Sequence, residues 1–254
     1  MIREVETFIL KIWRGTPGRQ YWEEFELPLC EGENVISALM EIQKHPVNRA
    51  GKRVEPVVWE MGCLEEVCGS CSMLINGFPR QACTALVAQL LSEERVVTLA
   101  PFTKFPLVRD LIVDRGVMFE NLKKVEAWID EEKSDQCGFG SLISQDKQQL
   151  MYALAQCMTC GCCSEACPQT HRGTRFIGPA AIAQVQLFNT HPTGRRKRRA
   201  RLRSLMGEGG ISDCGNAQNC VAVCPKHLPL TDSIAAMSRG VTLQALGDVF
   251  HLHD

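Results

Sequence analysis

The chain has 254 residues and a formal net charge of −1 at pH 7, so its overall charge indicates neither a nucleic-acid partner nor an anionic substrate. Its hydrophobic content of 45% and charged content of 22% are those of a globular protein, and its length allows two domains that each bury a core. No stretch approaches the roughly 18 apolar residues that a membrane span requires, and the N-terminus lacks the apolar core of a signal peptide. We therefore expect the protein to stay in the reducing cytosol, where its fourteen cysteines predict metal sites rather than disulfides.

The N-terminal part predicts strands around one helix. Partial alternation of apolar and polar residues predicts a strand over residues 6–14, and residues 21–29 predict a second strand after the Gly/Pro turn at 16–18. Asn34 is expected to cap a helix over residues 34–44, whose apolar residues recur at helical spacing.

Further strands are expected on either side of the first cysteine group. Residues 56–60 (PVVWE) predict a short strand that leads into the group, and residues 95–102 (RVVTLAPF) predict the strand that closes the domain. Between them, Asn76-Gly77 is a strong two-residue turn signal, which predicts a hairpin. We expect a small α+β domain over residues 1–106.

The rest of the chain, residues 107–254, predicts a mainly helical domain. Apolar residues at helical spacing predict helices over residues 118–129 and 150–157, with a polar connector over residues 130–149 between them. Two later helices carry end signals.

Pro179 is expected in the first turn of a helix over residues 179–189. Thr231 is expected to cap a helix over residues 232–239, which Gly240 would end.

The first cysteine group has the spacing C-x4-C-x2-C followed by a fourth cysteine, which is how plant-type ferredoxins hold a [2Fe–2S] cluster. Gly62 and Gly69 are expected to allow tight turns in which backbone N–H groups approach the sulfurs. Four-thiolate zinc is the alternative, although zinc usually takes paired C-x2-C units. A Rieske centre is excluded because no histidine lies within the group. The expected [2Fe–2S] ligands are Cys63, Cys68, Cys71 and Cys83.

The second half of the chain contains an internal repeat, CMTCGCCSEACP and CGNAQNCVAVCP, whose frame is that of two-cluster ferredoxins. In those proteins the fourth cysteine of each run, before proline, binds the cluster of the other run. The expected [4Fe–4S] ligands are therefore Cys157, Cys160, Cys163 and Cys224. The remaining ligands are Cys167, Cys214 and Cys220.

Ala217 stands where the second run should have its second cysteine. A cube that lacks one cysteine is stable as a [3Fe–4S] centre, and cluster type is a main determinant of reduction potential. The alternative of a decayed site is disfavoured because the other ligands of the frame and both prolines are intact. Cys162 lies outside the frame and is expected not to be a ligand, while Cys30 and Cys137 are expected to be free, buried cysteines.

Three different clusters in this order resemble the iron–sulfur subunit of succinate dehydrogenase and of its relative, quinol:fumarate reductase. The resemblance covers nearly the whole chain and includes PVVWE, GSCSMLINGFPRQACTAL, TKFPLVRDLIVDR, FIGPAA and DCGNAQNCVAVCPK. It is greatest to the Gram-positive, menaquinone-type form, in which the subunit sits between a flavoprotein and a membrane cytochrome b. The fold it implies is a plant-type [2Fe–2S] ferredoxin (β-grasp) domain followed by a mainly helical, bacterial-ferredoxin-like domain.

The resemblance also implies a function. Succinate would reduce FAD on the flavoprotein partner, and electrons would pass singly through the [2Fe–2S], [4Fe–4S] and [3Fe–4S] clusters to a membrane quinone, with this chain at the cytoplasmic face of the cell membrane. The chain would supply no catalytic residue, because hydride chemistry needs the flavin that it does not bind. Two alternatives stay open: the reverse flow of quinol:fumarate reductase, and a soluble thiol-driven fumarate reductase or heterodisulfide-reductase-like complex. No Cys-Cys-Gly repeat follows Cys224, which favours the membrane complex.

The chain departs from the ubiquinone-reducing relatives at the expected three-iron centre. Those relatives have a tryptophan after the first Cys-Pro and a histidine after the first cysteine of the second run, whereas here the first stretch is PQTHRGTRFIGP and Gly215 follows Cys214. We therefore expect the quinone site in the membrane partner and assign no quinone residue. His171 is expected at the surface or in an interface.

A basic run, TGRRKRRARLR, covers residues 193–203. It lacks the interleaved aromatic residues and the recognition fold of a nucleic-acid site. A solvated loop or helix face is expected, and contact with anionic headgroups or an acidic partner surface is the alternative.

Overall fold

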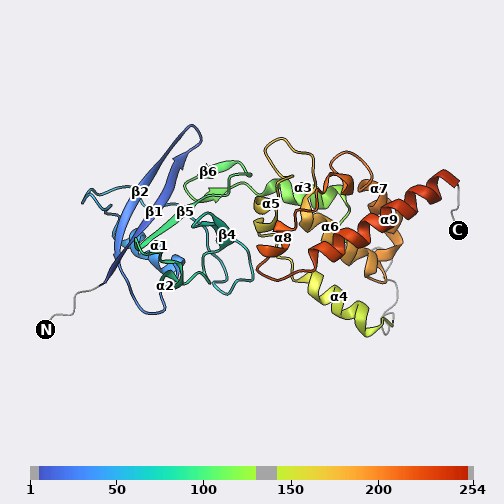
Figure 1. Cartoon of the computed structure of the whole chain (residues 1–254), viewed down its shortest axis with the longest axis horizontal. Helices are drawn as coiled ribbons and strands as arrows, with labels where there is room; N and C mark the ends of the chain where they lie inside the picture. Colours follow the sequence, from blue (N-terminus) through green and yellow to red (C-terminus); the bar gives the residue numbers. More distant parts are fainter. Residues whose placement is uncertain (1–5, 130–141, 251–254) are drawn as a thin grey trace. The chain divides into compact units, whose positions relative to one another are not determined.

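A computed structural model of the chain describes residues 6–129 and 142–250 (Figure 1). The described residues form two compact units. The first contains the chain up to Arg115 together with Cys160–Glu165, and the second contains Gly116–Thr159 and the chain from Ala166 onward. The domain boundary predicted at residue 106 stays a prediction. Among the described helices, none has the length and apolar character needed to span a lipid bilayer.

A five-stranded mixed sheet forms the centre of the first unit, in the order β2-β1-β5-β3-β4 (Figure 1). β1 and β5 are parallel, and the other neighbouring pairs are antiparallel. The strands predicted over residues 6–14, 21–29 and 95–102 and the Asn76-Gly77 hairpin are confirmed. The strands are β1 (Thr7–Thr16), β2 (Arg19–Pro28), β3 (Ser72–Ile75), β4 (Phe78–Gln81) and β5 (Val96–Ala100).

One helix, α1 (Val35–Lys44), covers the apolar face of this sheet and shares its core. The predicted cap is confirmed: the side chain of Asn34 accepts a hydrogen bond from the N–H of Ser37 at 2.9 Å, and the hydroxyl of Ser37 accepts one from the N–H of Asn34 at 2.9 Å. This reciprocal arrangement is a capping box, which satisfies N–H groups that the first turn of a helix leaves without partners.

The strand predicted over residues 56–60 is wrong. The segment has no strand geometry, and the carbonyl oxygen of Val58 accepts a single backbone hydrogen bond, from the N–H of Leu111 at 3.1 Å. The N–H of Val58 donates to the carboxylate of Asp110 at 2.8 Å. Two short strands, β6 (Leu107–Arg109) and β7 (Ile112–Val113), flank this aspartate, and one turn of helix, α2 (Val87–Leu90), precedes β5.

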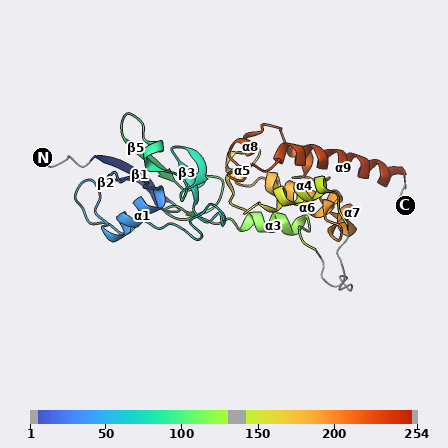
Figure 2. The ribbon, with the colours of Figure 1, turned by 90° about the horizontal axis from the view of Figure 1, so that it is seen from below.

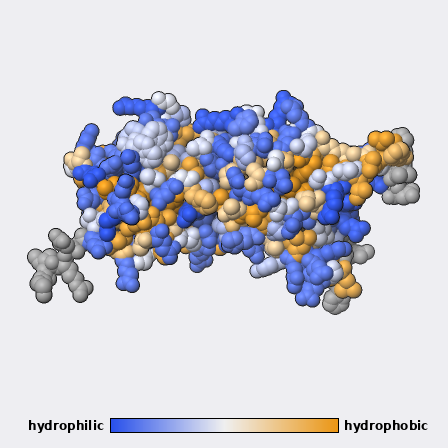
Figure 3. Space-filling model, in the orientation of Figure 1, coloured by the Kyte–Doolittle hydropathy of each residue, from blue (hydrophilic) through white to orange (hydrophobic). Residues whose placement is uncertain are grey.

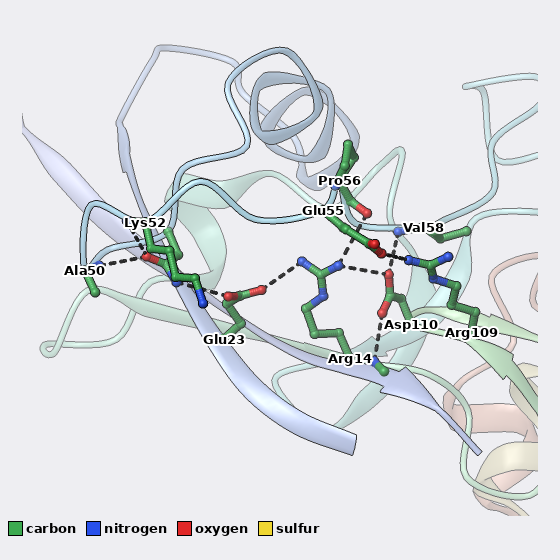
Figure 4. Close-up of polar contacts among 11 residues, drawn as sticks. Arg14, Glu23, Ala50, Lys52, Glu55, Pro56, Val58, Arg109 and Asp110 are labelled. Atoms are coloured by element: carbon green, nitrogen blue, oxygen red, sulfur yellow. Dashed lines mark hydrogen bonds and ion pairs between the residues drawn. The ribbon is translucent and has the colours of Figure 1, made fainter. Parts of the chain in front are cut away.

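The carboxylate of Asp110 is the centre of a buried polar network (Figure 4). It accepts hydrogen bonds from the N–H groups of Gly15, at 2.7 Å, and Val58, and it lies 3.4 Å from the guanidinium of Arg14. The same guanidinium donates to Glu23 at 2.8 Å. Arg14 and Asp110 are 2% and 1% exposed, so each charge depends on the other to offset the cost of burial.

The second unit is helical, and α6 is its central helix. α6 contacts α3, α4, α7 and α9 and lies among them in both views (Figures 1 and 2). Its buried residues lie on all sides, as expected for a helix surrounded by others. The helices outside the cysteine runs are α3 (Gly116–Lys124), α4 (Gln145–Ala155), α6 (Gly178–Thr190), α7 (Arg198–Ser204) and α9 (Leu230–Phe250).

The predicted helix over residues 179–189 is confirmed, with a proline in its first turn. The helix predicted over residues 118–129 is shorter, because α3 ends at Lys124 and Glu126 has a left-handed φ of 48°. α4 begins at Gln145, so the last residues of the predicted connector are helical, while residues 130–141 lie outside the described residues.

Gly240 does not end a helix, and Thr231 does not cap one. α9 begins at Leu230 and continues through Gly240 to Phe250. A Cβ at position 240 would lie 3.1 Å from Cδ2 of Leu202, so the glycine allows α9 to approach α7 closely. The glycine that suggests a helix end in the sequence is therefore a packing residue.

The basic run at residues 193–203 is only partly solvated. It forms a 3₁₀ turn (Gly194–Lys197) and α7, in which Arg201 is 1% exposed. Its guanidinium donates to the carbonyl oxygens of Glu126, Trp128 and Gly194, at 2.9, 2.8 and 2.6 Å. The expectation of a solvated face is wrong for this residue, which joins three segments of the second unit.

The C-terminal half of α9 carries apolar side chains that are half or more exposed among the described residues (Figure 3). A contiguous apolar stripe on a protein surface often marks an interaction site. The stripe consists of Leu243, Leu246, Val249 and Phe250.

Candidate metal centres

The loop from Cys63 to Cys71 curls so that backbone N–H groups point at cysteine sulfurs. Cys63 Sγ accepts from the N–H groups of Glu65, Val67 and Cys68 at 3.4, 3.2 and 3.3 Å. Such donors stabilise an ionised thiolate, which is the form that binds iron. The donor set therefore fits the predicted [2Fe–2S] centre.

Left-handed residues produce this curl. Leu64, Glu66 and Gly69 have φ values of 61°, 55° and 74°. The backbone bends at Gly62 without a left-handed φ, and a Cβ there would lie 2.9 Å from Cys68 Sγ, so this glycine leaves room for that sulfur.

The β3–β4 hairpin brings Cys83 back beside Cys71, as predicted. Asn76 and Gly77 have φ values of 50° and 75°, as in the tight turns that favour this dipeptide. Burial raises the pKa of Cys71 to about 12, and the neighbouring Cys83 side chain adds to the rise. In contrast, the N–H of Cys63 lowers the pKa of the exposed Cys68 to about 6.

The middle of the first repeat run, Cys160–Glu165, belongs to the first unit. Arg115 fixes it there, because its guanidinium donates to the carbonyl oxygens of Gly69 at 2.6 Å and Cys160 at 3.3 Å. Gly161, with φ of 91°, packs against Phe102 and Phe105. The segment includes most of α5 (Cys162–Ala166).

Cys160, Cys162 and Cys163 are buried in this segment. A hydrogen bond with Cys162 lowers the pKa of Cys160 to about 7, and the same contact raises the pKa of Cys162. The contact therefore favours the proton on Cys162 and the negative charge on Cys160. The place of Cys162 outside the ligand set stays a prediction. Cys157 and Cys224 are partly exposed and lie in the second unit.

The structure brings together the three cysteines predicted for the three-iron centre. Cys167, Cys214 and Cys220 line one small pocket of the second unit, and Ala217 lines it with them. Burial raises the pKa of Cys220, and the charges of Cys167 and Cys214 add to this effect. A pocket whose lining includes three cysteines, with an alanine where the frame would place a fourth, fits a cluster with one uncoordinated corner.

Local backbone geometry shapes this pocket. Asn216 and Gln218 have left-handed φ values of 51° and 61°, which curl the chain between Cys214 and the single turn α8 (Asn219–Ala222). Asn219 donates to the carbonyl oxygen of Ala166 at 3.1 Å and so joins the two repeat runs.

Among the described residues, no three His, Cys, Asp or Glu side chains converge as a single metal ion requires. A polynuclear cluster has a different need, since each thiolate binds its own iron at a corner. Cys167, Cys214 and Cys220 accordingly line one shared pocket.

The expectation that Cys30 and Cys137 are buried can be checked for only one of them. Cys30 is exposed, so the expectation that it is buried is wrong. Cys137 lies outside the described residues. His171 is exposed, as predicted for a surface histidine.

Comparison with known proteins agrees with this geometry. A family model described as a 2Fe-2S iron-sulfur cluster binding domain matches residues 9–120, and one described as a 4Fe-4S dicluster domain matches residues 153–228. The succinate dehydrogenase iron-sulfur subunit of Bacillus subtilis is 54% identical over 230 residues, which cover 91% of this chain and 90% of that protein. This chain belongs to the family of succinate dehydrogenase and fumarate reductase iron–sulfur subunits. The fumarate reductase iron-sulfur subunit of Wolinella succinogenes is 35% identical over 70% of this chain and 74% of its own length.

The fold of this family is also present. A chain from the Mycobacterium smegmatis Sdh1 complex superimposes with a TM-score of 0.80, at 24% identity, over 93% of this chain and 96% of that one. The predicted order of a plant-type ferredoxin domain and a helical dicluster domain is confirmed. As a family member, the chain is an electron-transfer subunit of an oxidoreductase complex.

Proposed function

We propose that this subunit carries electrons between the FAD of a flavoprotein partner and a quinone held by a membrane partner. Iron–sulfur clusters, when bound, take up and release one electron at a time. The chain's own cysteines fix these groups, and its backbone N–H groups stabilise their negative charge.

The proposed ligands form three sets. The first unit would hold a [2Fe–2S] cluster, and the repeat frame assigns a [4Fe–4S] and a [3Fe–4S] cluster. The sets are Cys63, Cys68, Cys71 and Cys83; Cys157, Cys160, Cys163 and Cys224; and Cys167, Cys214 and Cys220.

The observation that carries this proposal is the pocket in which three cysteines meet Ala217. A site with four cysteines would suit a second [4Fe–4S] cluster, whereas this site lacks the ligand for one iron. Two complete sites and one incomplete site are the combination expected of a relay whose stations differ in potential.

We place the quinone with the membrane partner, which we propose to be a cytochrome b subunit using menaquinone. Around the proposed three-iron site, Gly215 offers no side chain, and a Cβ there would lie 2.6 Å from Nε2 of Gln169. The apolar stripe on α9 provides surface for a partner subunit. In this arrangement the chain is peripheral, at the cytoplasmic face of the membrane.

EPR of the purified complex during a redox titration, with succinate and with dithionite, tests the relay. We expect three distinct EPR signals, one from each cluster, and each signal should change at its own potential as the clusters are reduced in turn. Iron far below about nine atoms per polypeptide, the sum for the three cluster types, would overturn the proposal. The direction of flow is tested in the same complex: menaquinone reduction by succinate supports a dehydrogenase, and faster fumarate reduction by menaquinol supports the reverse reaction.

A further inference from the structure

Gln81, the last residue of β4, lies between two buried cysteines of the first unit. Its side chain is enclosed, since the residue is 1% exposed. Its Oε1 lies 3.6 Å from Cys71 Sγ, and its Nε2 lies 3.5 Å from Cys162 Sγ. Cys71 is a proposed [2Fe–2S] ligand, whereas Cys162 lies outside every ligand set.

Ser72 contacts both ends of the same amide. Its Oγ lies 3.1 Å from Oε1 and 2.9 Å from Nε2 of Gln81. The hydroxyl donates its own hydrogen to the carbonyl oxygen of Gly69 at 2.6 Å. Toward Gln81 it therefore acts as an acceptor, and it can accept from an N–H at either end of the amide.

The amide orientation in the structure suits a Cys71 that carries a hydrogen. The thiol then donates to Oε1, and the NH₂ group donates to Ser72 and Cys162. An iron-bound Cys71 is a thiolate, which has no hydrogen to donate. Oε1 would then face an ionised sulfur, and two acceptors would lie together in a buried site, which is unfavourable.

A half-turn of the amide removes this conflict, because the oxygen and nitrogen of a glutamine side chain exchange places with little change in shape. The NH₂ group then donates to the sulfur of Cys71 and to Ser72. The oxygen faces Cys162, whose S–H can donate to it. An S–H group is a weak donor compared with an amide N–H, so the ionised Cys71 decides the orientation.

We propose that Gln81 is a positioning residue that donates an N–H hydrogen bond to the Cys71 sulfur of the [2Fe–2S] centre and raises its reduction potential. The inference rests on the proposed ligand set. Hydrogen bonds to cluster sulfurs are a main determinant of potential, because they stabilise the extra negative charge of the reduced state. Gln81 adds a side-chain donor to the backbone donors that face Cys63 and Cys68.

The test is an EPR-monitored redox titration of the assembled complex. Gln81→Met keeps the length of the side chain but has no donor, so the [2Fe–2S] midpoint potential should shift downward while the signal keeps its full intensity. Gln81→Glu, which puts an oxygen at both ends, should shift it downward as well. Gln186→Met is the matched control, because Gln186 is a buried glutamine of the second unit. In this variant the [2Fe–2S] midpoint potential should equal that of the unsubstituted protein.

A second measurement needs no substitution. In protein labelled with ¹⁵N at glutamine side chains, the reduced [2Fe–2S] centre should show a ¹⁵N hyperfine coupling, and Gln81→Met should abolish it. Absence of the coupling, or an unshifted potential in both Gln81 variants, would overturn the inference. Absence of any [2Fe–2S] signal in the unsubstituted complex would instead overturn the proposed function.

Discussion

Glu165 and Thr103 are joined by two hydrogen bonds to a single carboxylate oxygen. Oε1 of Glu165 accepts from the N–H of Thr103 at 2.9 Å and from its hydroxyl at 2.6 Å. Oε2 of the same carboxylate accepts from the N–H of Lys104 at 3.1 Å. Glu165 is buried, so this carboxylate holds the Cys160–Glu165 segment against the loop after β5.

Glu165→Gln should loosen this segment. The amide offers one acceptor atom where the carboxylate offers two, and its NH₂ group would face an N–H donor. Because hydrogen bonds to charged groups contribute about 1.5–3 kcal/mol, amide hydrogen exchange at Thr103 and Lys104 should be at least about tenfold faster. Glu120→Gln, which alters an exposed ion pair with Lys123, should leave exchange at these two residues unchanged. Equal protection in both variants would contradict the prediction.

Ala217→Cys should convert the three-iron centre into a four-iron centre. The new thiolate would lie in the pocket of Cys167, Cys214 and Cys220 and would coordinate the missing iron. The three-iron EPR signal should disappear, and that of a second [4Fe–4S] cluster should replace it.

The control for this substitution is Ala222→Cys, which adds an exposed cysteine in the same run but outside the frame. Its three-iron signal should remain. A persistent three-iron signal in Ala217→Cys would count against the assignment of position 217.

Thiol labelling should separate ligands from free cysteines. With clusters bound, a maleimide should modify Cys30, which is exposed, and leave Cys162 unmodified, since it is 0% exposed. Removal of iron by a chelator under denaturing conditions should allow the maleimide to modify the eleven proposed ligands, including the exposed Cys68. Mass spectrometry of the labelled peptides shows which cysteines have reacted. Rapid labelling of Cys68 in the intact loaded protein would contradict its assignment.

Arg201→Met should destabilise the second unit. The substitution leaves the carbonyl oxygens of Glu126, Trp128 and Gly194 without this donor. The free energy of unfolding of this unit should fall by about 3 kcal/mol, because breaking a buried charged network costs about 3–5 kcal/mol and methionine restores part of the packing. Thermal unfolding of the complex measures the effect. Arg198→Met, an exposed change in the same run, should alter the unfolding temperature little.

Local signals predicted the parts of the fold that local chemistry determines. Asn34 caps α1 and Asn76-Gly77 makes the β3–β4 turn, because in both cases the deciding hydrogen bonds or φ angles lie within a few residues. The cysteine frame predicted that Cys167, Cys214 and Cys220 meet, and these three line one pocket, while the full ligand sets stay predictions. A ligand set must converge, and the frame of the repeat limits which sulfurs can do so.

The features that sequence reasoning missed depend on contacts between distant segments. The N–H of Val58 donates to the side chain of Asp110, fifty-two residues later, and its carbonyl oxygen accepts from the N–H of Leu111, so the partners of the apolar run at residues 56–60 lie far along the chain. Gly240 lies within α9 because it packs on Leu202, which no helix-end rule can reveal. No sequence pattern marks Gln81 as a functional residue. Its proposed role follows only from the position of its amide beside the sulfurs of Cys71 and Cys162.

Asp110 also bears on how the N-terminal module could be separated from the rest of the chain. A fragment cut at Pro106 would lose the carboxylate that Arg14, Gly15 and Val58 share. Arg14 would then retain Glu23 as its remaining carboxylate partner in this network, and two backbone N–H groups would lose their acceptor. An excised ferredoxin module would need to extend beyond β7 to keep Asp110 and its hydrogen bonds to Arg14, Gly15 and Val58.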